Sequence, residues 1–270
     1  MVRKIIYVSV FVFLLISTPV IAGSTGNEEL KGSESQGSTE ECFEGFSRAM
    51  FKFNHALDST IYEPVAKGYR AIPMPIRKGT GNAMDNLRSL LTLSNNILQG
   101  DFSGAGNTAA RFAINTTAGI LGIFDPATKL GFKEKGKEDF GQTMGVWGTN
   151  SGCYFVLPIL GPTTTRDAVG LVGNIFIDPV YHITHNSEIR NGVVGNDNYS
   201  EHNYYYYRGT SAVDFRAKNI ESFDSLKKNS IDLYASVKSI YLQDRKKKIA
   251  NSQSVIETQD DSDWEEIDTN

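Results

Sequence analysis

The sequence carries none of the short motifs by which common catalytic sites are recognised. It has no G-x-S-x-G elbow, no H-E-x-x-H zinc motif and no C-x-x-C pair. Its four histidines are dispersed, and only His182 and His185 share a helical spacing, without a third ligand nearby. We therefore expect no metal, no cofactor and no enzymatic activity, although catalytic groups that meet only in space would leave no such signal.

An excess of positive charge and an abundance of cysteine are also missing. The chain has 27 basic and 31 acidic residues, a net charge of -4, and so lacks the basic footprint expected of a protein with a nucleic-acid partner. Its two cysteines, Cys42 and Cys153, lie far apart in the sequence. They could form one disulfide in an oxidising compartment, but their spacing does not require it, and we expect two free thiols.

The two ends of the chain differ in composition from its middle. Residues 1–22 have Arg3 and Lys4, an apolar run and a small-residue ending at Ala22, which predicts a secretory signal peptide; a retained membrane anchor is the alternative. Residues 23–42 are rich in Gly, Ser, Thr and Glu and are expected to form a flexible linker. Residues 249–270 are acidic and predict a disordered tail.

Residues 43–248 have the periodicity of a helical domain. Phe43, Phe46, Met50, Phe53 and Leu57 recur at spacings of three and four, which predicts a first helix with a buried aromatic stripe. Further helices are expected over 61–71, 76–98 (ended by Gly100), 107–117, from 163–165 to the break at Asp178-Pro179, and over 220–241, a single amphipathic helix. In the helix that follows Thr165 we expect Ala168, Val169, Leu171, Val172 and Ile175 to be buried.

Two segments with little or no charge interrupt this helical pattern. Residues 112–124 are mostly small or apolar, and residues 140–165 include no charged residue. Glycines and prolines divide the second segment too often for a membrane-spanning helix, and they predict a short hairpin through Gly148 to Gly152. Such a segment is either a buried hairpin of a soluble core or backbone packed against protein beside lipid.

Seven sequence blocks resemble the MlaA (VacJ) family of outer-membrane lipid-asymmetry proteins. The blocks follow the family's order and cover nearly all of the chain from Phe43 to Arg245. They are FEGFSRAMFKFNHALD (43–58), YEPVAKGYR (62–70), NNILQGD (95–101), RFAINTTAGILGIFDPA (111–127), EDFGQTMGVWG (138–148), YFVLPILGPTTTRDAVG (154–170) and SIDLYASVKSIYLQDR (230–245). The resemblance implies a mainly α fold, a ring-like helical domain with a short glycine-rich hairpin and a long C-terminal amphipathic helix.

The resemblance also implies a function in phospholipid transport. In that picture the ring lies at the periplasmic face of the outer membrane beside a trimeric porin. Phospholipids misplaced in the outer leaflet pass through its amphipathic channel to a soluble periplasmic lipid carrier of the MlaC type. The low-charge segments suit such a site, because a charge at the bilayer centre costs at least ~2.5 kcal/mol. The alternatives from other classes are a periplasmic lipid-acting hydrolase and a surface adhesion or virulence module.

Several residues are assigned roles by the resemblance. The hairpin beside the channel corresponds to residues 145–154, including Gly145, Gly148, Gly152 and Tyr154; the alternative role of the glycines is turns with positive φ. Phe53 and Asn54 lie in the region tied to gating, with core packing and a helix-face amide as their alternatives. The lipid-facing candidates are Phe112, Ile120, Leu121 and Phe124. Arg166 and Asp167 match a family pair, expected to be a structural cap or ion pair.

The chain departs from the family pattern at its cysteines. Family members are commonly lipoproteins with a cysteine directly after the signal sequence. Here Gly23 follows Ala22, and Cys42 lacks a preceding lipobox. We therefore expect attachment to the membrane through the helical ring rather than through a covalent lipid.

Overall fold

The computed structural model describes residues 41–185 and 202–265, which belong to one compact unit. The predicted signal peptide and most of the predicted linker lie outside the described residues. The unit is mainly helical, as expected. Its elements in chain order are α2 (Glu44–Leu57), the π-helical turn η1 (Asp58–Tyr62), α3 (Glu63–Arg70), α4 (Met74–Gln99), α5 (Phe102–Thr117), α6 (Pro126–Lys129), α7 (Phe140–Val146), β1 (Tyr154–Leu157), β2 (Gly161–Thr164), α8 (Thr165–Ile177), α9 (Pro179–His185), α11 (His202–Lys218), α12 (Ile220–Asn229) and α13 (Leu233–Glu265).

Local sequence signals set several helix ends. Gly100 ends α4 with φ of 81°, a left-handed conformation that a residue without a Cβ adopts at little cost. The side chains of Asp101, Asp139 and Thr164 accept hydrogen bonds from backbone N–H groups in the first turns of α5, α7 and α8. The expected helix start at Thr165 and the break before Pro179 are confirmed.

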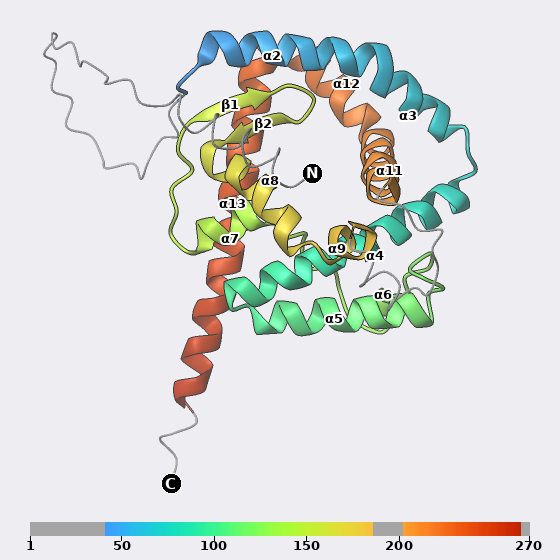
Figure 1. Ribbon diagram of the computed structural model, residues 1–270, viewed down its shortest axis with the longest axis vertical. Helices are drawn as coiled ribbons and strands as arrows, with labels where there is room; N and C mark the ends of the chain where they lie inside the picture. Colours follow the sequence, from blue (N-terminus) through green and yellow to red (C-terminus); the bar gives the residue numbers. More distant parts are fainter. Residues whose placement is uncertain (1–40, 186–201, 266–270) are drawn as a thin grey trace, which may run out of the picture. The chain divides into compact units, whose positions relative to one another are not determined.

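The helices of this unit form a closed circuit of contacts (Figure 1). In sequence around the circuit, α2 contacts β1, β2 contacts α13, α13 contacts α7, α7 contacts α4, α4 contacts α11, and α11 contacts α3, which returns through η1 to α2. Helix α5 packs along α4. The ring-like arrangement expected for the chain is thus present.

The two strands form an antiparallel hairpin next to α2. Tyr154 pairs with Thr164 and Leu157 with Gly161, so the chain turns through residues 158–160. The predicted turn at Gly148 to Gly152 is wrong: these glycines lie in the loop that leads from α7 into β1. Tyr154 and Val156 alternate along β1 and are both fully buried, so the face of β1 that carries them packs against the interior.

Buried apolar side chains form only small clusters. One joins Ala66, Ala217 and Ile220, and the other joins Tyr154, Val156 and Tyr234. Among the described residues the buried set contains more polar and charged side chains than apolar ones. The buried interior is therefore held largely by hydrogen bonds, each of which contributes about 0.5–1.5 kcal/mol net.

Many large apolar side chains lie on the outside instead. Phe43, Phe46 and Phe53 are 64%, 53% and 49% exposed, so the predicted buried aromatic stripe of the first helix is wrong. The same reversal occurs on α8, where Val169, Leu171, Val172, Ile175 and Phe176 are exposed. Exposed apolar area on this scale is unusual for a soluble monomer and marks a surface that meets protein or lipid.

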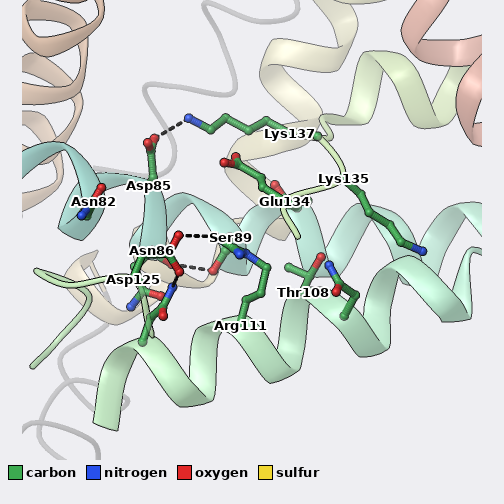
Figure 2. A pocket seen from close by; sticks show the side chains of 14 residues that line it. Asn82, Asp85, Asn86, Ser89, Thr108, Arg111, Asp125, Glu134, Lys135 and Lys137 are labelled. Atoms are coloured by element: carbon green, nitrogen blue, oxygen red, sulfur yellow. Dashed lines mark hydrogen bonds and ion pairs between the residues drawn. The ribbon is translucent and has the colours of Figure 1, made fainter. Parts of the chain in front are cut away.

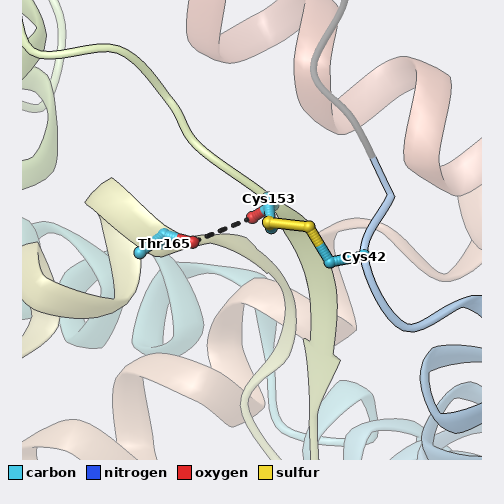
Figure 3. The surroundings of a disulfide bond; sticks show 3 residues. All are labelled: Cys42, Cys153 and Thr165. Carbon is cyan, nitrogen blue, oxygen red and sulfur yellow. Dashed lines mark hydrogen bonds between the residues drawn. A yellow bond between two sulfur atoms is a disulfide. The ribbon is translucent and has the colours of Figure 1, made fainter. Parts of the chain in front are cut away.

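A disulfide joins Cys42 to Cys153, which corrects the expectation of two free thiols (Figure 3). It ties the start of the domain to the residue before β1. Glu41 adds a parallel bridge to Tyr154 and an ion pair with Lys238 at 2.5 Å. The last two residues of the predicted flexible linker therefore belong to the folded unit.

The C-terminal helix differs from the prediction at both ends. The expected helix over 220–241 is divided, because α12 ends at Asn229 and α13 begins at Leu233. Helix α13 then runs to Glu265, so the structure is helical over most of the stretch where we expected a disordered tail. No helix within residues 41–185 and 202–265 combines the length and the hydrophobicity needed to cross a membrane.

Candidate functional site

One cavity is lined by both apolar and charged side chains. Its volume is about 470 Å³, and it lies between α2, η1, the tip of the hairpin, α11, α12 and α13. Its apolar lining includes Phe51, Leu57, Ile159, Leu160, Phe215, Phe223, Leu226, Leu233 and Val237; its polar lining includes Asn54, His55, Asp58, Tyr62, Glu63, Arg216, Asp224 and Lys227. A cavity lined by both kinds of side chain suits an amphipathic ligand.

Arg216 is the central charge of the polar wall. Its Nε and Nη2 donate to the two carboxylate oxygens of Asp58 at 2.7 and 2.9 Å, and Nη2 lies 3.5 Å from Glu63. The hydrogen bonds to Asp58 raise the pKa of Arg216 against the opposing effect of burial, and nearby carboxylate charges add to the rise. The guanidinium also lies 4.7 Å from the ring centre of Phe223. This cluster joins α11 to the π-helical turn.

Asn54 fixes the hairpin tip against α2. Its Nδ2 donates to the carbonyl of Leu157 at 2.8 Å, and its Oδ1 accepts from the N–H of Ile159 at 2.7 Å. Ile159 has φ of 68°, a left-handed conformation that costs an L-residue roughly 1–2 kcal/mol. One side chain therefore holds a strained turn whose apolar residues form part of the cavity wall.

The structure separates the two residues of the predicted gating region. Asn54 lines the cavity, whereas Phe53 does not and is half exposed. Core packing, the alternative for Phe53, does not fit, because this side chain is not buried. The alternative for Asn54, a helix-face amide, is incomplete, because the amide is hydrogen-bonded to the hairpin. A gating role for either residue stays a prediction.

The residues predicted for the channel hairpin are also distributed over different elements. Gly145 is buried in α7, Gly148 and Gly152 are in the loop with φ of 87° and 66°, and Tyr154 begins β1. Positive φ explains the two loop glycines as turn residues. None of the four lines the amphipathic cavity, which the hairpin reaches only through residues 159–162.

Three of the four lipid-facing candidates lie in the turn after α5, and Phe112 lies within α5. Ile120, Leu121 and Phe124 are exposed, and Phe112 is half-buried. Ile120 and Leu121 have φ of 53° and 56°, so this turn holds two consecutive apolar residues in the left-handed region. Phe124 also lines an open apolar groove with Ile76 and Ile123. Their contact with lipid stays a prediction.

A second, polar pocket lies between α4 and α5 under residues 134–137 (Figure 2). Its volume is about 70 Å³, enough for small polar molecules such as water. Four of its charged side chains form two ion pairs within the fold, Lys137 with Asp85 and Arg111 with Asp125. We read it as a polar joint between two helices.

An ionic clamp holds the C-terminal helix to the ring. Arg245 of α13 donates to both carboxylate oxygens of Asp139 at 2.6 and 2.9 Å and to Asp167 at 2.7 and 3.0 Å. Burial opposes the ionisation of Asp139, but the hydrogen bonds and charge of Arg245 outweigh it and hold the pKa of Asp139 well below its usual range. Arg166 also pairs with Asp167, which confirms the expected ion pair.

Sequence reasoning missed the charged cluster of the cavity. Neither Asp58 nor Arg216 was singled out from the sequence. The two residues are far apart in the chain, and no local motif connects them. Within the described residues, no group of three or more His, Cys, Asp or Glu side chains could hold a metal ion.

The fold and the cavity together define a class of protein. Apolar side chains are exposed around a helical ring, polar groups are buried within it, and an amphipathic cavity lies among its elements. This arrangement belongs to proteins that hold amphipathic molecules beside an apolar phase.

Comparison with known proteins identifies the family. The model of the MlaA lipoprotein family matches residues 39–248, and the chain belongs to this family. It is 30% identical to the intermembrane phospholipid transport system lipoprotein MlaA of Haemophilus influenzae over 89% of this chain and 90% of that protein. The same-named Escherichia coli K12 protein is 30% identical over 85% of this chain and 84% of that protein.

Two further comparisons agree with this assignment. A Rickettsia prowazekii protein is 38% identical over 146 residues, so the match spans 53% of this chain and 58% of that protein. A solved structure described as the structural basis for maintenance of bacterial outer membrane lipid asymmetry superposes with a TM-score of 0.62 at 29% identity. It covers 78% of this chain and 99% of its own.

Proposed function

We propose that this protein transports phospholipids and thereby maintains the lipid asymmetry of a bacterial outer membrane. The observation that carries the proposal is the amphipathic cavity among the elements of a ring that exposes many large apolar side chains. A phospholipid needs a polar surface for its headgroup and an apolar one for its acyl chains. The family membership and the names of the Haemophilus and Escherichia relatives support the same function.

The proposed location is the periplasmic face of the outer membrane. Exposed side chains such as Phe43, Leu121 and Phe176 would lie among acyl chains, where removal of their apolar surface from water lowers the free energy. Both cysteines of the sequence are joined in the disulfide, so neither offers a thiol for lipid attachment. The apolar exterior therefore carries the attachment. We propose a trimeric porin as the neighbour in the membrane and a soluble carrier of the MlaC type as the acceptor.

Narrowing the cavity tests the transport route. Ala212 lines the cavity on α11, whereas Ala235 on α13 is exposed outside it. In vesicles that contain the full chain, we expect Ala212→Trp to lower the transfer of labelled phospholipid to the carrier at least tenfold. Ala235→Trp should leave it unchanged. Equal transfer by both variants would contradict passage through this cavity.

Two observations separate transport from the other functions. Deletion of the gene should expose phospholipid in the outer leaflet of the source bacterium, and an unchanged leaflet would count against the proposal. Purified protein incubated with labelled phospholipid should return it intact. Release of lysophospholipid would favour a hydrolase instead.

A further inference from the structure

Two charged side chains that line the amphipathic cavity, and one nitrogen of a third, have no hydrogen-bond or ion-pair partner among the described residues. Arg216 is only 6% exposed, and its Nη1 has no hydrogen-bond partner although its other two nitrogens are bonded. A buried N–H group without a partner costs about 1–3 kcal/mol, and a ligand that supplied an acceptor would recover this cost.

Helix α12 supplies a carboxylate and an ammonium beside this arginine. Asp224 and Lys227 both line the cavity, and the side chain of neither makes an ion pair or a hydrogen bond with the described residues. They are three residues apart on one helix, so they lie on the same face with about 5–6 Å between their Cβ atoms. They are near enough to meet opposite ends of one small dipolar group.

The balance of charge around the cavity favours a ligand without net negative charge. Of the carboxylates that line it, Asp58 is paired with Arg216 and Glu63 with Lys67, so Asp224 and Lys227 remain as one carboxylate and one ammonium without an ion pair in the described part of the chain. A headgroup with only negative charge would meet the carboxylate of Asp224 uncompensated, whereas a zwitterion presents an ammonium to Asp224 and a phosphate to the cations. Like charges brought together disfavour the wrong ligand.

The geometry points to selection of zwitterionic phospholipids that carry an amino headgroup, with the phosphate at Arg216 and Lys227 and the ammonium at Asp224. This inference rests on the proposed transport of phospholipid and adds the class of headgroup. Phosphatidylethanolamine is the simplest lipid of this class, because its two-carbon spacer holds the ammonium close to the phosphate.

Lipid retained by the purified full chain provides the test. The protein is equilibrated with vesicles of equal phosphatidylethanolamine and phosphatidylglycerol and separated from them, and its bound lipid is measured by mass spectrometry. We expect phosphatidylethanolamine to be enriched about fivefold, which corresponds to ~1 kcal/mol. Asp224→Lys should remove or reverse the enrichment, and Asp244→Lys, the same change at an exposed position of α13, should not.

The outcomes distinguish this inference from the function on which it depends. Bound lipid in equal proportions, or an identical shift in both lysine variants, would overturn the headgroup selection and leave transport standing. A protein that retains neither lipid would contradict both. Asp224 and Lys227 are exposed, so their substitution does not threaten the fold.

Discussion

Replacing Asn54 by leucine should loosen the hairpin tip without unfolding the ring. The change keeps the branching of the side chain at Cγ but removes both hydrogen bonds to the turn, those with Leu157 and Ile159. Two such bonds are worth about 1–3 kcal/mol net. Ile159 is 63% exposed, so water replaces part of the loss and the lower half of that range applies. The strain at its left-handed φ adds to the tendency to open.

Hydrogen exchange measures this loosening directly. A local loss of ~1–2 kcal/mol should speed exchange of the amides of residues 155–163 about 5- to 30-fold. Amides of α4 and α5 should keep their protection. The matched control is Asn107→Leu, which removes a similar bond, from Nδ2 to the carbonyl of Lys133, far from the hairpin.

The reasoning fails if the hairpin of the Asn54→Leu protein stays as protected as in the wild type. It fails equally if Asn107→Leu accelerates the hairpin amides to the same extent. Because Ile159 and Leu160 form part of the cavity wall, we expect the looser tip to alter phospholipid transfer as well.

Three further predictions concern stability. Reducing the disulfide, which closes a loop with a sequence separation of 111, should lower the free energy of unfolding by about 2–5 kcal/mol, measured by denaturation with and without reductant. Because the pKa of Asp139 is lowered in the folded protein, the ionised carboxylate stabilises the fold at pH values above 3.8, the usual pKa of an aspartate. This stabilisation is lost as the pH falls below 3.8 towards the lowered pKa. Asp139→Asn should therefore flatten acid denaturation curves, and an unchanged curve would refute the role of the clamp to Arg245. A Cβ at Gly170 would lie 2.5 Å from a backbone nitrogen of α7, so Gly170→Ala should destabilise the protein by about 1–3 kcal/mol, while Gly106→Ala, in open space on α5, should stabilise it slightly.

Helix boundaries were predictable where one residue decides them. Gly100 ends a helix through its left-handed conformation, and Pro179 prevents α8 from continuing. The separation of α12 from α13 was not predictable in this way. The apolar spacing continues through the break, and Ser230, the residue after α12, adopts an extended conformation without a proline or glycine to signal it.

The direction of burial was the main error of the sequence interpretation. Periodicity showed that α2 and α8 have apolar faces, but we assigned those faces to a core. In the structure they are exposed, and the buried side contains residues such as Ser47, Arg166 and Asp167. An amphipathic pattern gives two faces and does not state which one points outward.

Of the candidate site, too, the sequence indicated some residues and left others without a signal. Asn54 belongs to a region that the family resemblance had singled out, and the structure adds its two hydrogen bonds to the hairpin turn, while its gating role stays a prediction. Arg216 carried no signal, because an arginine that pairs with a distant carboxylate looks like any other charged helix residue. The disulfide was equally open, since two cysteines are compatible with a bond or with free thiols.

By itself, the sequence determined the mainly helical class, several helix ends and the family, because capping residues, glycine, proline and ordered blocks act locally along the chain. The tertiary structure alone decided which faces are buried, where the hairpin turns, that Cys42 meets Cys153, and that Asp58, Arg216 and Asp224 line one cavity. These features depend on contacts between residues far apart in sequence, and closure of the ring brings them together.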